Sequence, residues 1–138
     1  MADREYKRRN EEFLARMAQE EGVVELSSGV LARKLVCADR NSFSSPCPKP
    51  NSIVYVHYTG RLIDGKVFDT TEGDALPALF VVRDLIMGWQ IALTRMHEGD
   101  KWEIYIPAKW GYGSFKQPDI PANSTLVFTL ELVKIERL

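Results

Sequence analysis

The stretch that decides the fold is Val56-His57-Tyr58-Thr59-Gly60-Arg61-Leu62-Ile63-Asp64-Gly65-Lys66-Val67-Phe68-Asp69. At its start, Val56 and Tyr58 alternate with His57, which is the period-2 spacing typical of a β-strand. Asp64-Gly65 then supplies the residues that accept positive φ in a tight hairpin turn. The chain returns through Phe68 to a single carboxylate, Asp69. The stretch therefore predicts a β-hairpin that forms one side of an apolar pocket.

Hydrophobic periodicity predicts further elements on both sides of the hairpin. Strands are expected at 30–37, 79–82, 101–107 and 125–135, and a loop rich in Ser and Pro at 39–50. A short helix is expected at 89–96, because Trp89, Ala92, Leu93 and Met96 recur at helical spacing. Together these elements predict an α+β domain, with an antiparallel β-sheet wrapped around one short helix.

The first residues of the chain predict a second helix. It is expected to run from Asp3, a plausible N-cap, to Glu21, just before Gly22. Its apolar stripe occupies only the second half and consists of Phe13, Leu14, Met17 and Ala18. Two interpretations remain open: a solvated helix that docks by its C-terminal turns, or a contact with a second copy or another partner. The chain is accordingly divided into an N-terminal helical extension, 1–29, and a domain, 30–138.

Composition excludes several classes of protein. The 138 residues include 18 Lys and Arg against 19 Asp and Glu, a net charge of −1 that does not favour nucleic acid or anionic membranes as partners. The apolar runs are too short to span a bilayer, and the charged start, Met1-Ala2-Asp3-Arg4, is not secretory, so a cytoplasmic location is expected. Cys37 and Cys47 form no metal signature, and whether they pair in a disulfide stays open. No metal or cofactor is expected.

Five short motifs follow one another along the chain. In order they are VHYTGRLIDGKVFD, LIMGW, GYG, IP and TLVFTLELVKI. This series resembles the peptidyl-prolyl cis-trans isomerases of the FK506-binding protein (FKBP) family, over residues 30–137. The N-terminal helix with Gly22-Val23-Val24 and Ser28-Gly29-Val30-Leu31 further resembles the macrophage infectivity potentiator branch. The resemblance implies a highly twisted antiparallel sheet around a short helix, in agreement with the periodicity.

The resemblance also implies a proline-binding pocket. Its catalytic residues would be Tyr58, Phe68, Asp69, Ile86, Trp89, Tyr112 and Phe128. Its further substrate or ligand contacts would be Phe80, Leu85, Ile120 and Ala78. In the family, the backbone N–H at the position of Ile86 and the hydroxyl at the position of Tyr112 donate to a carbonyl of the bound molecule.

Two features depart from the family pattern. Ala78 stands where an aromatic wall is common, which would open that side of the pocket. The loop 114–122 carries charged and amide side chains where small residues are common. Both bear on ligand affinity and sequence preference more than on activity.

Taken singly, the same residues have simpler interpretations. Trp89 and Phe128 have the spacing of core residues, and Asp69 could serve as a turn residue. Neither His57 nor His97 has a nucleophile beside it in sequence, so hydrolysis has little support. Only the joint pattern indicates a site.

The predicted function is catalysis of rotation about X-Pro peptide bonds, which assists protein folding. The expected partners are proline-containing peptides and proteins, and macrolides of the FK506 and rapamycin type, with no nucleic acid and no membrane. The chain is expected to be a monomer or a dimer through the N-terminal helix. The alternative is a non-catalytic module or chaperone that uses the same pocket to bind a proline peptide or a macrolide.

Overall fold

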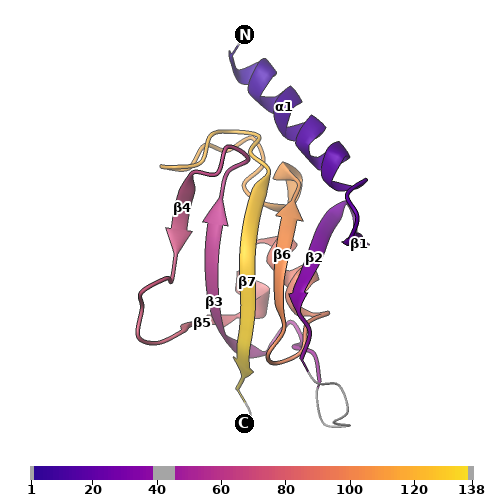
Figure 1. The fold of residues 1–138 in the computed structure, drawn as a ribbon. Coiled ribbons are helices and arrows are strands. Elements are labelled where there is room, and N and C mark those ends of the chain that lie inside the picture. The colour runs from indigo at the N-terminus through magenta and orange to yellow at the C-terminus, as the bar shows by residue number, and fades with distance from the viewer. Residues whose placement is uncertain (1, 39–45, 137–138) are drawn as a thin grey trace.

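The structure is a computed structural model that describes residues 2–38 and 46–136. Its elements are α1 (Ala2–Met17), β1 (Val23–Ser27), β2 (Val30–Val36), β3 (Ile53–Arg61), β4 (Val67–Thr70), β5 (Ala78–Val81), the 3-10 turn η1 (Val82–Asp84), α2 (Met87–Leu93), β6 (Lys101–Ile106), the 3-10 turn η2 (Ala108–Trp110) and β7 (Leu126–Ile135) (Figure 1). Most of the loop expected at 39–50 lies outside the described residues, since 39–45 are not described.

The strands form one antiparallel sheet. Their order is β1-β2-β6-β7-β3-β4, and β5 pairs with the first half of β3 (Figure 1). The long central pair β3 and β7 runs from Val54 opposite Ile135 to Arg61 opposite Val127. The predicted hairpin places Asp69 opposite Gly60. The register of this hairpin therefore brings the carboxylate of Asp69 beside the strand that carries Tyr58.

The short helix α2 packs against one face of the sheet, behind it in Figure 1. The approach is close because Gly88 has no side chain: a Cβ there would lie 2.4 Å from Cγ2 of Ile106. The core between helix and sheet is made of fully buried apolar side chains, among them Val54, Val56, Leu93, Ile104, Leu130 and Leu132. This arrangement confirms the predicted α+β fold, a sheet around a short helix preceded by an N-terminal helix.

The structure corrects the prediction for the first 29 residues. The helix ends at Met17 rather than Glu21, and Val23–Ser27 forms a strand that pairs with β2. The sequence pattern does not predict this strand, because it has only five residues, two of them exposed, and lacks the alternation that marks a half-buried strand. The boundary expected at residue 29 thus falls between two paired strands, and only 2–17 of the extension is helical.

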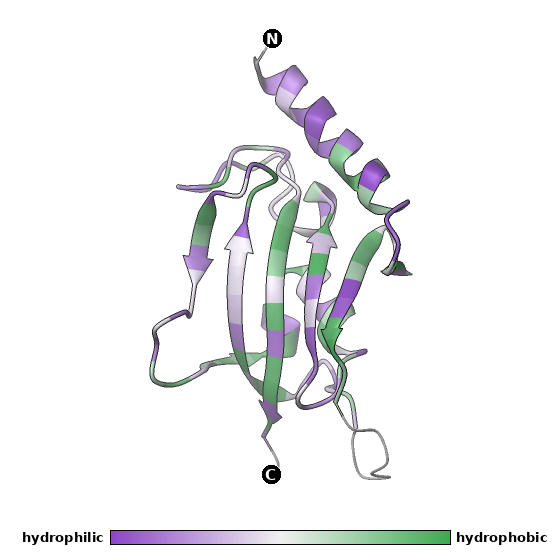
Figure 2. Cartoon of the chain, in the orientation of Figure 1, coloured by the Kyte–Doolittle hydropathy of each residue, from purple (hydrophilic) through white to green (hydrophobic). Residues whose placement is uncertain are grey.

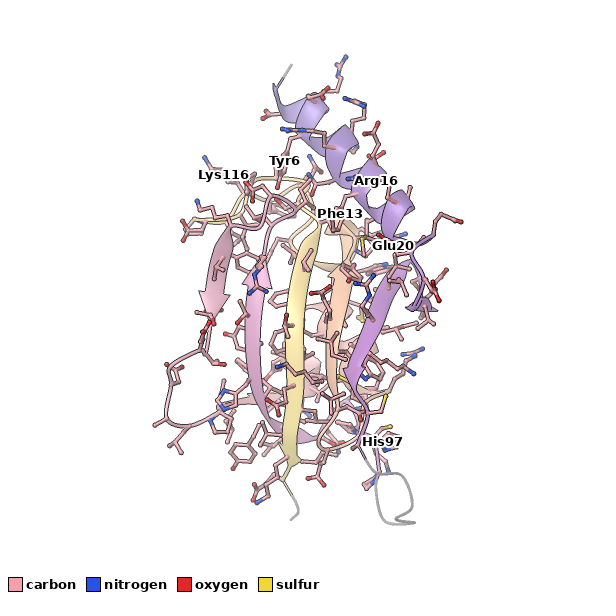
Figure 3. The ribbon with its side chains drawn as sticks, in the orientation of Figure 1. Tyr6, Phe13, Arg16, Glu20, His97 and Lys116 are labelled. Carbon is pink, nitrogen blue, oxygen red and sulfur yellow. The ribbon has the colours of Figure 1, made fainter. Side chains whose placement is uncertain are left out.

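Helix α1 docks on the outer face of the sheet. Phe13, Leu14 and Met17 pack against a small cluster of Leu31, Tyr105 and Val127. Figure 2 shows that hydrophobic residues gather in the second half of α1, and Figure 3 shows Phe13 pointing toward the sheet. The apolar docking of the helix therefore runs through its C-terminal turns, as the first of the two interpretations predicts.

Two further observations concern the chemistry expected of the chain. Neither helix of the described residues is both long and apolar enough to cross a bilayer. Cys37 and Cys47 are not joined by a disulfide, and residues 2–38 and 46–136 hold no group of three His, Cys, Asp or Glu that could bind a metal ion.

The close approach of α2 to the sheet generates a stability prediction. In Gly88→Ala, the added methyl group meets three carbons of Ile106, so we expect a loss of about 1–3 kcal/mol in the free energy of unfolding. Urea unfolding measures it. The neighbouring Met87→Ala, at an exposed position on the same helix, is the control and should change stability by less than about 0.5 kcal/mol. Equal stability of the two variants would contradict the packing described here.

Candidate functional site

A pocket of about 330 Å³ opens between the β3–β4 hairpin, the start of α2 and the loop that follows β6. Its lining consists of Tyr58, Phe68, Asp69, Phe80, Asp84, Leu85, Ile86, Trp89, Tyr112 and Phe128. Nine of these ten residues are among those that the family resemblance implies for a pocket. The tenth, Asp84, was missed because nothing in the periodicity of residues 79–89 marks it.

Trp89 forms the floor of this pocket. Only 4% of its surface is exposed, and three rings meet its indole nearly edge to face: Tyr58 at 4.9 Å between centroids, Phe128 at 5.2 Å and Phe80 at 5.8 Å. Aromatic rings prefer this geometry over face-to-face stacking. The indole N–H finds no acceptor among the described residues. The three rings therefore fix the orientation of the floor, which is apolar apart from this indole N–H.

The segment before α2 is held by the helix itself. Gln90 donates from Nε2 to the carbonyl oxygen of Leu85 at 2.7 Å, and to that of Arg83 at 3.2 Å. Ile86 is the N-cap of α2, and its carbonyl oxygen accepts the N–H of Trp89. The N–H of Ile86 has no acceptor among the described residues. Gln90, which no sequence pattern marks, thus fixes a wall of the pocket in which the backbone N–H of Ile86 remains available to a bound molecule.

Gly60 allows two aromatic rings to meet over the backbone of β3. A Cβ at this position would lie 2.6 Å from both Cε1 of Phe128 and Cζ of Phe68, far closer than carbon atoms approach. These two rings pack edge to face, with centroids 5.5 Å apart. The glycine in the motif VHYTGR is therefore required by the packing of the pocket wall and not by a turn.

A hydrogen bond joins the two polar groups of the hairpin. The hydroxyl of Tyr58 donates to Oδ2 of Asp69 at 2.7 Å. Burial of the phenol, and then its bond to Asp69, raise the pKa of Tyr58 well above its usual value. The phenol stays protonated as a donor, and the carboxylate is oriented at the rim. The lining also contains Asp84 but no Lys, Arg or His, so its charged groups are all acidic.

Tyr112 reaches the pocket from the loop after β6. The loop is folded tightly, since both Gly111 and Gly113 donate their N–H groups to the carbonyl oxygen of Ala108. A Cβ on Gly111 would lie 2.8 Å from Cδ1 of Leu126, so the loop lies directly on the last strand. The hydroxyl of Tyr112 makes no hydrogen bond within the described part of the chain. It is a second donor available to a bound molecule.

The structure places the two remaining candidates outside the lining. Ile120 is buried in the core and lines a separate hollow together with Tyr6 and Leu62. Ala78 lies on β5 opposite Val56, half-buried against the core. Each position depends on how β5 and the long loop are folded, which sequence spacing does not determine.

The two histidines lie away from this pocket. His57 contacts the hydroxyl of Thr71 at 3.0 Å through Nδ1, and His97 lies 3.6 Å from the thiol of Cys47. Neither belongs to the pocket lining. The pocket therefore combines aromatic rings and two carboxylates with the donors of Ile86 and Tyr112 and the buried indole N–H of Trp89.

The aromatic wall generates a prediction at Gly60. In Gly60→Ala the methyl group displaces the rings of Phe68 and Phe128, and we expect a weaker near-ultraviolet dichroism and a loss of about 1–3 kcal/mol in unfolding free energy. Adding Phe68→Leu removes one of the two obstructing rings. The double variant should recover part of the lost signal from the remaining rings, and no recovery would contradict the assigned contact.

The environment of Tyr58 generates a prediction on alkaline stability. Because the folded state raises the pKa of this phenol, its contribution to stability is full below the ordinary value of about 10 and is lost as the pH rises through the folded pKa. Tyr58→Phe has no proton to lose. Its free energy of unfolding should therefore fall less than that of the wild type as the pH rises above about 10. Parallel curves from urea unfolding at each pH would count against the raised pKa.

Comparison with known proteins finds the same family over most of the chain. The model of the FKBP-type peptidyl-prolyl cis-trans isomerases matches residues 45–133. The FKBP-type 22 kDa peptidyl-prolyl cis-trans isomerase of Escherichia coli is 42% identical over 89% of this chain and 58% of its own length. Outer membrane protein MIP of Legionella longbeachae is 38% identical over 96% of this chain and 55% of its own. The chain thus spans about half the length of these curated relatives.

A solved structure agrees with both the fold and the family. The crystal structure of a peptidyl-prolyl cis-trans isomerase from Pseudomonas syringae superposes with a TM-score of 0.85 at 33% identity, over 97% of this chain and 96% of that one. The protein accordingly belongs to the FKBP-type peptidyl-prolyl cis-trans isomerase family, and within it resembles the macrophage infectivity potentiator branch.

Proposed function

We propose that this chain accelerates rotation about X-Pro peptide bonds in the pocket above Trp89, and so assists the folding of proteins. One observation carries the proposal: an apolar floor of edge-to-face rings with a single hydrogen-bonded phenol and carboxylate, Tyr58 and Asp69, at its rim. The substrates would be proline-containing peptides and flexible segments of proteins.

The chemistry of the amide explains why an apolar pocket suffices. Resonance gives the C–N bond a rotational barrier of about 18–20 kcal/mol, and unaided X-Pro bonds interconvert in about tens to hundreds of seconds. Twisting the bond localises the lone pair on nitrogen and reduces the separation of charge. A dry cavity therefore favours the twisted state over the planar one, which is the differential binding that catalysis requires. A preference of about 1.4 kcal/mol for the twisted state increases the rate of rotation tenfold.

The polar groups would hold the twisted bond in place. The N–H of Ile86 and the hydroxyl of Tyr112 are donors without acceptors among the described residues, and each would bind a carbonyl oxygen of the substrate. Phe68, Phe128 and Trp89 would enclose the proline ring. Rotation breaks no covalent bond, so this mechanism needs neither a metal nor a cofactor.

Macrolides of the FK506 type are proposed as ligands of the same pocket, at the level of the family. Its volume of about 330 Å³ and its ring-lined walls suit an apolar molecule with carbonyl groups. Ala78 and Ile120 do not line the pocket, and such a ligand would contact lining residues such as Phe80, Leu85 and Tyr112 instead. The alternative function is a module that binds such ligands without catalysing isomerisation, and the assay described below distinguishes the two.

Location and assembly belong to the same proposal. A cytoplasmic location is proposed from the sequence, whereas one relative is named as an outer membrane protein. Cell fractionation with an antibody against the chain would separate the two. A monomer or a dimer through α1 is proposed from the sequence pattern, and sedimentation would distinguish them.

The assay uses a protease-coupled peptide containing one X-Pro bond. The wild type should exceed the thermal rate, and Asp69→Leu should lower kcat/KM about tenfold, because the carboxylate no longer accepts from Tyr58 at the rim. Glu72→Leu makes the same change at an exposed position outside the pocket lining, and should leave activity unaltered. Both variants should keep the wild-type far-ultraviolet dichroism.

Two results would revise the proposal. Full activity in Asp69→Leu would remove this carboxylate from the mechanism. A wild type that binds FK506 but does not exceed the thermal rate would leave only the binding module.

A further inference from the structure

We propose that two parts of the N-terminal segment, the first half of α1 and the β1–β2 turn, hold the two ends of the loop that carries Tyr112, and that Asn10 is the residue through which α1 positions that loop. The loop, residues 107–125, is called the Tyr112 loop below. This inference rests on the proposed function, since it assigns the N-terminal segment a role in presenting Tyr112 to the substrate.

The first anchor lies at the start of the Tyr112 loop. The indole Nε1–H of Trp110 donates to the carbonyl oxygen of Ser28 at 2.9 Å, across 82 positions of sequence. Ser28 occupies the β1–β2 turn at φ 55°, a conformation that most side chains avoid. A Cβ on Gly29, in the same turn, would lie in van der Waals contact with Pro107. The turn of the N-terminal segment therefore fixes the residues just before Tyr112.

The second anchor lies at the end of the loop and begins with Tyr6. The hydroxyls of Tyr6 and Ser124 are 2.7 Å apart, and Ser124 itself donates to the carbonyl oxygen of Pro121 at 2.7 Å. Since Ser124 has a single hydroxyl proton, Tyr6 is the donor in the first bond. Figure 3 shows Tyr6 reaching from α1 to the loop near Lys116, and both residues line one hollow.

Asn10 adds two hydrogen bonds to the second anchor. Its side chain is 2% exposed, and its Oδ1 accepts the N–H of Thr125 at 2.7 Å while its Nδ2 donates to the carbonyl oxygen of Tyr6 at 2.7 Å. Thr125 is 1% exposed, so its N–H cannot donate a hydrogen bond to solvent instead. Removing the amide of Asn10 would leave a buried donor unsatisfied at the end of the loop.

A short path leads from the second anchor to Tyr112. Asn123, next to Ser124, donates its N–H to the carbonyl oxygen of Gly113 at 2.8 Å, and Gly113 follows Tyr112 directly. Asn123 has φ 64°, a left-handed conformation that the neighbouring contacts must hold. The anchors at Ser124 and Thr125 therefore restrain the backbone on which Tyr112 stands. A donor restrained before binding loses less entropy when substrate arrives.

The division of labour along α1 supports this role. In the second half of the helix, Phe13 and Met17 dock by apolar contacts with the sheet. The first half, which lacks an apolar stripe, docks by the polar bonds of Tyr6 and Asn10. Packing alone would not need a buried amide in a half of the helix that has no apolar stripe.

Steady-state kinetics of the full chain test the inference. Tyr6→Phe and Asn10→Ala each weaken the second anchor, and kcat/KM should fall roughly three- to tenfold as Tyr112 becomes less well placed. Met17→Ala is the control: it removes apolar docking of the same helix without touching the loop. It should lower Tm yet keep kcat/KM within about twofold of the wild type.

A double-variant cycle separates positioning from general destabilisation. If Asn10 acts through Tyr112, the loss in Asn10→Ala/Tyr112→Phe is smaller than the product of the two single losses. Losses that multiply, or a control that loses as much activity as Asn10→Ala, would overturn the inference. Should Asn10→Ala fail to fold, the same cycle is run with Tyr6→Phe, which deletes only a hydroxyl.

Hydrogen exchange provides a readout that does not depend on activity. In Tyr6→Phe the amides of Asn123 and Thr125 should exchange faster than in the wild type, whereas those of β3 should not change. Unchanged exchange at Asn123 and Thr125 overturns the anchor. Faster exchange supports it even if the wild type proves to have no isomerase activity, a result that would count against the proposed function alone.

Discussion

The packing of rings against the indole of Trp89 is the interaction on which both the fold and the pocket depend. Trp89 stands on the first turn of α2, and the rings that meet it come from β3, β5 and β7. The contact is possible because Gly88 lets the helix lie on β6 and Gly60 leaves room over β3. The same side chains thus belong to both the core and the floor of the pocket. A substitution that changes the packing of the core therefore also changes the pocket.

A pocket built in this way makes its few polar groups effective. The hydrogen bond between Tyr58 and Asp69 lies at the exposed rim of the pocket and orients the carboxylate there. The phenol keeps its proton because burial penalises the phenolate, and the carboxylate beside it adds to the effect. Ile86 and Tyr112 then offer donors with no competing acceptor among the described residues. Apart from the indole N–H of Trp89, the polar side-chain groups of the lining lie at the rim.

Sequence reasoning predicts the parts of this molecule that depend on local pattern. The hairpin of β3 and β4 follows from alternation and the Asp64-Gly65 turn, and α2 follows from the spacing of its buried face. The pocket residues came from the family resemblance, because Trp89 or Phe128 alone has the spacing of a core residue. Contacts between distant segments left no local signal: β1 is too short and exposed, and Gln90, Asp84 and Asn10 matter only through what the fold places beside them.

Strand β1 has a consequence for the integrity of the sheet. It pairs with β2 from Val23 opposite Arg33 to Ser27 opposite Val30, and so covers one border of the sheet. A fragment that began at residue 30 would leave β2 with a row of unpaired backbone groups, next to the apolar patch of Leu31, Tyr105 and Val127 that α1 now shields. Such a border is a template for pairing with other chains. Strand β1 takes this edge position in the protein itself, and α1 covers the apolar patch.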